Sequence, residues 1–187
     1  MAYVALTCRW VICGVFLAAA LTKVRNRASW EAFVSAVSEL VPMGAAPLGA
    51  LVVGVELAVA VLVALPATVT AGLLLATGTL VAFSIAIWSA LRRGVAVACR
   101  CFGWSDAPVS QAHLVRNGVL IVLAVVGLVA GQAAGGAVLH PAGIAVGVAA
   151  ALVLIVLVTT VDDLAWLLLR RGDAAEAHAR VSPSGRA

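Results

Sequence analysis

Charged and aromatic residues are scarce in this chain, and their scarcity excludes several classes of protein. Of the 187 residues only 11% are charged and 5% are aromatic, whereas 64% are hydrophobic and the mean hydropathy is +1.16. An average soluble domain has about 25% charged and about 45–50% apolar residues. The composition therefore excludes an ordinary soluble domain, a disordered chain and a secreted disulfide scaffold. We expect the bulk of the protein to lie in a lipid bilayer.

Cysteine and recognisable ligand motifs are also sparse. The four cysteines, Cys8, Cys13, Cys99 and Cys101, are too few and too scattered for a disulfide framework. A zinc site is not expected, because Cys99, Cys101 and His113 would supply three ligands at irregular spacing. There is no phosphate-binding glycine loop and no serine–histidine arrangement. The net charge of +4 does not indicate nucleic acid binding, since Lys and Arg gather on the cytoplasmic side of membrane proteins.

Five hydrophobic stretches are long enough to cross a bilayer, which takes about 20 mostly apolar residues. Residues 1–171 are thus predicted to form one all-α transmembrane domain, an integral membrane helical bundle, and the polar residues 172–187 a disordered tail. The predicted spans are about residues 2–21, 47–65, 69–91, 117–132 and 141–161, the last of which ends at 161 or at 169. A short uncharged turn at residues 66–68 makes the second and third of these spans an antiparallel hairpin.

The segment 23–46, between the first two spans, has a helical pattern of its own. Its large apolar residues recur at helical spacing, with Glu31, Ser35, Ser38 and Glu39 between them. This pattern predicts an amphipathic helix that lies in the membrane interface. The apolar positions are Trp30, Phe33, Val34, Val37 and Val41.

The distribution of positive charge predicts the orientation of the chain. With five spans, eleven of the Lys and Arg residues fall on one side and Arg9 alone on the other. The excess predicts a multi-pass plasma-membrane protein with its N-terminus outside and its C-terminus in the cytoplasm, and it places Cys99 and Cys101 on the cytoplasmic side. We expect residues 1–22 to remain uncleaved, because no basic residue precedes Arg9 and a basic cluster follows at 23–27.

The pair Cys99 and Cys101 is the most informative local feature. Arg100 lies between the two sulfurs in sequence, and nearby positive charge favours the reactive thiolate. Two cysteines so close together form a strained, exchange-prone disulfide, and Gly103 permits a turn directly after them. The residues alone favour dithiol–disulfide exchange over a structural cross-link. The alternative is that Cys99 and Cys101 are simply small apolar residues without a redox role.

Cys8 and Cys13 belong to a predicted helix. Their separation of five residues places them about 7.5 Å apart along the helix axis and on different faces. A disulfide needs Cα atoms within about 7 Å. We therefore expect no bond between them and interpret both as packing residues.

Glu56 and Arg9 are predicted to lie deep in the membrane, where ionisable residues are costly. Glu56 is near the middle of the second span, and Arg9 lies about 4 Å above the midpoint of the first at about 1.5 Å per residue. Lys23 lies about 16–17 Å below that midpoint. Depth therefore favours Arg9 over Lys23 as the partner of Glu56. The carboxyl either fixes helix packing or accepts protons beside a thiol or quinone site.

The chain resembles the MauE family of methylamine-utilisation membrane proteins, which are related to DoxX-type proteins. The resemblance covers about residues 10–130, so the fold is expected to be a four-helix MauE/DoxX-like core with a fifth transmembrane helix added. The Cys-x-Cys-Phe-Gly element is its most specific part. The matching elements are Gly14-Val15-Phe16, Lys23, Glu56-Leu57, Cys99-Arg100-Cys101-Phe102-Gly103 and Arg116-Asn117.

The resemblance implies a thiol-disulfide oxidoreductase role for Cys99 and Cys101, exchanging electrons with a thioredoxin-like or other dithiol partner. The namesake of the family is thought to help form disulfides in the small subunit of methylamine dehydrogenase, a role outside the cytoplasm, in conflict with the charge count. Two alternatives stay open: a non-catalytic membrane subunit or assembly factor, and a quinone-linked oxidoreductase subunit, with quinone as its cofactor. The expected supporting residues are Arg100, Phe102, Gly103, Glu56, Arg9, Lys23 and Arg116.

Overall fold

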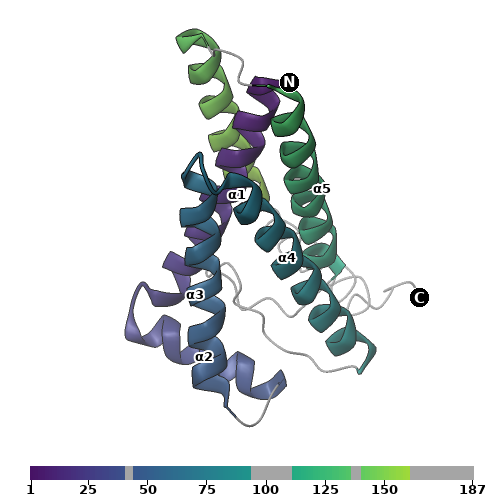
Figure 1. The fold of residues 1–187 in the computed structure, drawn as a ribbon. Helices are drawn as coiled ribbons and strands as arrows, with labels where there is room; N and C mark the ends of the chain where they lie inside the picture. The colour runs from purple at the N-terminus through teal and green to yellow at the C-terminus, as the bar shows by residue number, and fades with distance from the viewer. Residues whose placement is uncertain (41–43, 94–110, 136–139, 161–187) are drawn as a thin grey trace, which may run out of the picture.

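The computed structural model describes residues 1–40, 44–93, 111–135 and 140–160, and all the regular structure in these ranges is helical (Figure 1). The prediction of an all-α protein is thereby confirmed. A sixth helix, Pro141–Thr160, follows the five labelled ones and is called the last helix below. The labelled helices are α1 (Ala2–Val24), α2 (Arg27–Leu40), α3 (Ala45–Ala64), α4 (Val69–Arg92) and α5 (Gln111–Ala133).

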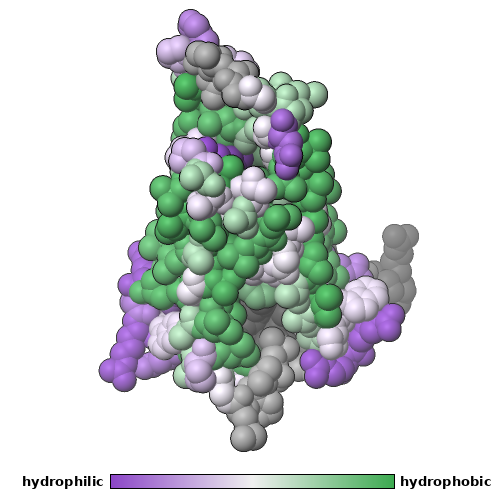
Figure 2. All heavy atoms as spheres, viewed as in Figure 1, coloured by the Kyte–Doolittle hydropathy of each residue, from purple (hydrophilic) through white to green (hydrophobic). Residues whose placement is uncertain are grey.

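Five of these helices, all except α2, are long and apolar enough to cross a membrane. The protein is therefore an integral membrane helical bundle. Figure 2 shows the corresponding surface, on which hydrophobic residues cover most of the visible face and hydrophilic residues gather mainly at its lower corners. A surface of this kind suits contact with lipid tails, since the side chains that face outward do not need water.

Helix α1 is central to the bundle and packs against α3, α5 and the last helix. Helices α3 and α4 form the predicted antiparallel hairpin through the turn at residues 65–68, and α4 in turn packs against α5. The core between these helices consists mainly of buried aliphatic side chains, together with Phe16 and Cys13. Its largest fully buried members are Val11, Ile12, Val15, Val59, Val63 and Leu120.

Three close helix contacts depend on glycine. A Cβ atom on Gly72 of α4 would lie 2.7 Å from the backbone nitrogen of Val63 in α3. On the other side of α1, a Cβ atom on Gly14 would lie 2.3 Å from Ile155 of the last helix, and one on Gly143 would lie 2.2 Å from Tyr3. Small residues therefore allow α1 to lie directly against the last helix, and α3 against α4.

Helix α2 confirms the amphipathic helix predicted in the segment 23–46; its location in the interface stays a prediction. Asn26 caps the helix, because its Oδ1 accepts a hydrogen bond from the Ser29 backbone nitrogen at 2.7 Å. Phe33 is buried and packs with Ala20 of α1 and Val53 of α3. Helix α2 thus lies beneath the end of α1 and against the first turns of α3 (Figure 1).

The spans differ from the prediction mainly at their charged ends. Helix α5 begins at Gln111 rather than at 117, and α1 continues to Val24 rather than ending at 21. In both cases the added turns carry polar residues that are buried among helices, such as Arg116 and Lys23, and so do not mark a membrane boundary. The extension of the last span to 169 and the tail 172–187 lie outside the described residues.

Candidate functional site

Five polar side chains are buried inside the described part of the bundle, each no more than 5% exposed. Helix α5 contributes three of them at positions i, i+3 and i+4, which places them on one face of the helix. The others come from the last turn of α1 and the middle of α3. The five residues, called the polar cluster below, are Lys23, Glu56, His113, Arg116 and Asn117.

Two members of this cluster, Lys23 and Glu56, form an ion pair. Lys23 Nζ lies 2.6 Å from Glu56 Oε1, and the same nitrogen donates to the Ala19 carbonyl at 3.2 Å. It also lies 5.4 Å from the centroid of the Phe33 ring. The ammonium group therefore exchanges its hydration for a carboxylate, a carbonyl and an aromatic face.

The expectation that Arg9 would be the partner of Glu56 is therefore wrong. Arg9 Nε instead donates to the Val63 carbonyl at 2.7 Å, and Arg9 Nη2 donates to the Ala64 carbonyl. These carbonyls belong to the last turn of α3, where backbone acceptors have no partner within the helix. Arg9 thus caps the C-terminus of α3, where a positive charge also complements the helix dipole.

The error has a geometric cause. The prediction of Arg9 places the midpoints of the first two spans at the same depth, whereas α1 ends level with the middle of α3. The space beneath the end of α1 is filled by α2, whose Phe33 ring approaches closely because position 49 of α3 is glycine. Lys23 is therefore carried to the depth of Glu56, and its flexible stem reaches the carboxylate.

A small cavity opens beside the ion pair, between α1, α3, α4 and α5. Its volume is about 30 Å³, and its polar walls are Glu56, Arg116 and Asn117. The amide of Asn117 donates to Ser84 Oγ at 3.4 Å, while that hydroxyl donates to the Leu80 carbonyl at 2.7 Å. The remaining walls are apolar, so the polar groups that line the cavity come from α3 and α5.

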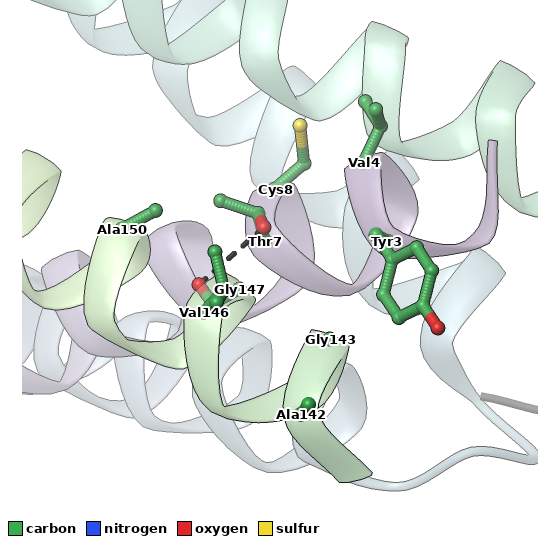
Figure 3. Close-up of a pocket in the computed structure, with 9 residues that line it drawn as sticks. All are labelled: Tyr3, Val4, Thr7, Cys8, Ala142, Gly143, Val146, Gly147 and Ala150. Carbon is green, nitrogen blue, oxygen red and sulfur yellow. Dashed lines mark hydrogen bonds between the residues drawn. The ribbon is translucent and has the colours of Figure 1, made fainter. Parts of the chain in front are cut away.

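A second, larger hollow lies at the opposite end of α1 and has a different character. It is an open groove of about 570 Å³ between the first turns of α1 and the last helix (Figure 3). In Figure 3 Thr7 Oγ1 donates across it to the Gly147 carbonyl at 3.4 Å, and the other labelled side chains are mostly apolar. None of the described residues that line this groove is charged.

The two cysteines of α1 are free thiols, as predicted. Cys8 is buried at the groove, where its Cβ is the atom that a side chain on Gly127 of α5 would meet at 2.9 Å. Cys13 is buried in the core, and its Sγ donates to the Ala60 carbonyl at 3.5 Å. Their environments support the interpretation of both as packing residues.

The Cys99–Cys101 pair and its neighbours Arg100, Phe102 and Gly103 lie outside the described residues. The described chain stops at Arg93, at the end of α4, and resumes at Gln111, at the start of α5. Because α4 and α5 are antiparallel, these two positions are at the same end of the bundle (Figure 1). The polar face of α5 begins two residues after Gln111.

Sequence reasoning placed Lys23, Glu56 and Arg116 among the supporting residues, and all three belong to the polar cluster. It did not include His113 and Asn117. Their spacing relative to Arg116 was the available signal, since three polar residues on one face of an otherwise apolar helix indicate a buried polar contact. Within the described residues no group of three or more His, Cys, Asp or Glu side chains is positioned to hold a metal.

The fold and the cluster define a small multi-pass helical membrane protein with a buried ion pair. The chain belongs to the MauE family, described as methylamine utilisation protein MauE, which it matches over residues 1–130. The match includes α1 to α4 and nearly all of α5, and it leaves the last helix outside. Comparison with curated proteins and with solved structures gave no match.

Proposed function

We propose that this protein is a membrane thiol-disulfide redox protein in which Cys99 and Cys101 exchange electrons with a thioredoxin-like or other dithiol protein. The observation that carries the proposal is the Cys-Arg-Cys-Phe-Gly element within the residues that match the MauE family. In this role the protein forms disulfides in a partner and so assists its maturation.

The exchange consists of two balanced displacement steps. A thiolate of the partner attacks the Cys99–Cys101 disulfide, which gives a mixed disulfide and one free thiolate on this chain. The second thiolate of the partner then attacks the mixed disulfide and releases the other cysteine. Two electrons pass from the partner to the pair, and the partner leaves as a disulfide. Arg100 favours the thiolate form of its neighbours.

The buried state of Cys8 and Cys13 supports the assignment of exchange to Cys99 and Cys101. Thiol exchange requires access for an attacking sulfur, and both α1 cysteines are packed against neighbouring helices. A partner protein cannot reach Cys13 without opening the core. Among the four cysteines, Cys99 and Cys101 are therefore the better candidates for exchange.

We further propose that the N-terminus is outside the plasma membrane and the C-terminus in the cytoplasm. Among the described residues, every Lys and Arg except Arg9 belongs to the half of the bundle that contains the ends of α1 and α4 and the start of α5. An excess of basic residues on one side is typical of the cytoplasmic face. With this orientation, the cysteine pair exchanges electrons either with a cytoplasmic partner or, through an electron relay across the membrane, with a partner outside.

The proposed exchange is tested on the full chain in lipid nanodiscs, equilibrated with glutathione redox buffers and then alkylated with a maleimide mass tag. In a Cys8→Ser/Cys13→Ser variant we expect two tagged cysteines under reducing buffer and none under oxidising buffer. Reduced thioredoxin should become oxidised by the oxidised form of this variant in a one-to-one ratio.

The Cys99→Ser/Cys101→Ser variant, which keeps Cys8 and Cys13, is the matched control and should not oxidise thioredoxin. If the cysteine pair stays reduced in every buffer, or if the control oxidises thioredoxin as well as the wild type does, the redox proposal fails. A scaffold role would then be the better interpretation.

A further inference from the structure

We propose that the cavity beside Glu56 binds a single water molecule, and that this water makes Glu56 a proton-exchanging carboxyl inside the membrane. The inference goes beyond the proposed thiol exchange and does not depend on it. It rests on three described side chains, Glu56, Arg116 and Asn117, which contribute to one cavity from two helices.

The carboxylate of Glu56 is satisfied on one oxygen only. Oε1 accepts from Lys23 Nζ, whereas Oε2 is buried and has no hydrogen-bond partner among the described residues. Leaving a buried acceptor unpaired is unfavourable, and more so when the group is charged. Native proteins rarely retain such an atom without a partner, which is frequently an ordered water.

The size of the cavity fits one water molecule. A buried water needs a cavity of about 10–15 Å³. The cavity beside Glu56 has about 30 Å³. A quinone ring or a lipid chain is far larger than this space. The cavity is therefore a solvent site rather than a cofactor site.

A buried water requires two to four hydrogen bonds. The polar walls of this cavity supply them. A water here donates to Glu56 Oε2, which can only accept while ionised. It accepts from Arg116, whose guanidinium has five N–H donors, or from the Asn117 amide, both of which line the same cavity. The remaining walls, which include Phe16, Leu80 and Leu120, are apolar, so the water has these polar groups as its hydrogen-bond partners.

The water gives Glu56 a route for protons that Lys23 does not block. A proton delivered to the water passes to Oε2, so that the carboxylate becomes a neutral carboxylic acid and the water is regenerated. The reverse transfer returns the proton. The ion pair therefore loses its negative charge when Glu56 is protonated and regains it when the proton is released.

Infrared difference spectroscopy on the full chain in nanodiscs tests the proposal without any activity assay. The bands lost in Glu56→Gln identify the Glu56 carboxyl. On acidification we expect its carboxylate band to convert to a carboxylic acid band that shifts in D₂O. A water band that shifts in H₂¹⁸O should be present in the wild type and lost in Ala19→Leu, which fills the cavity from α1.

Ala58→Leu is the matched control, since it makes the same change at an exposed position of α3 and should keep the water band. Failure of the Glu56 bands to respond to acid and D₂O, or a water band that Ala19→Leu leaves unchanged, would overturn the proposal. If Ala19→Leu does not fold, an experimental density map decides instead. A peak within hydrogen-bond distance of Glu56 Oε2 supports the site, and a well-ordered empty cavity refutes it.

Discussion

Lys23 Nζ lies 2.6 Å from Glu56 Oε1, and each side chain is only 3% exposed, so α1 and α3 are joined by an ion pair in the interior of the bundle. Two buried charges gain from their attraction only when both are present, because each alone must bear its full loss of hydration. The pair therefore makes each charge depend on the presence of the other more than it adds to stability.

Removing one member of this pair should be worse than removing both. We expect Lys23→Met to lower the free energy of unfolding by about 3–5 kcal/mol, because Glu56 is left buried without its cation. The double variant Lys23→Met/Glu56→Leu should recover most of that loss. Unfolding in mixed micelles, followed by tryptophan fluorescence, measures both. A double variant whose loss equals the sum of the two single losses would contradict the ion pair.

Arg9 should stabilise the protein independently of Glu56. Arg9→Leu removes two charged hydrogen bonds to the last turn of α3, each worth about 1.5–3 kcal/mol, so we expect a clear drop in the unfolding midpoint. Its effect should add to that of Lys23→Met within about 0.5 kcal/mol, since the contacts described for the two sites involve different residues. Strong coupling between them in the same assay would instead indicate that Arg9 does interact with the ion pair.

The close contact of α3 and α4 should tolerate no side chain at Gly72. A Cβ atom there would lie 2.7 Å from the Val63 backbone nitrogen, so Gly72→Ala must push the hairpin apart, at a cost of about 1–3 kcal/mol. Gly78 belongs to the same helix and has nothing within 4 Å of its Cβ position. Gly78→Ala should therefore leave the thermal midpoint unchanged or raise it. Equal midpoints for the two variants would be inconsistent with the packing described.

The proposed orientation predicts which ends are labelled from outside the cell. In a background with all four cysteines changed to Ser, Gln132→Cys at the end of α5 should react with a membrane-impermeant maleimide on intact cells. Arg93→Cys at the end of α4 should react only after the cells are opened. Both positions are exposed in the structure. The reverse pattern would place the N-terminus in the cytoplasm.

Hydrophobic length and helical spacing predicted most of the fold. The five spans, the hairpin at residues 65–68 and the amphipathic α2 follow from local composition, which each segment carries on its own. The start of α5 was missed because Arg116 and His113 look like residues of a membrane boundary. Whether a polar residue faces water or a partner helix depends on the other helices and is not encoded locally.

The sequence predicted several residues of the site, but not which of them form the ion pair. Glu56 and Lys23 stand out in the sequence because charge is so rare in it. Their contact depends on the vertical offset of α1 and α3, which is set by the packing of Phe33 beneath α1. The position of a residue along its own span does not reveal such an offset. Comparing depths along the two spans therefore pairs Glu56 with Arg9.

The contact between α1 and the last helix has a consequence for biosynthesis. Thr7 and Gly147, which meet across it, are 140 residues apart in the chain. Since a nascent chain emerges from its N-terminal end, α1 and α3 are synthesised before this neighbour of α1 exists. The residues that match the family can thus assemble first, and the last helix then docks on a surface already formed. Chains interrupted during translation after α5 would present that surface, with Tyr3 and Thr7, to lipid or to other proteins in the membrane.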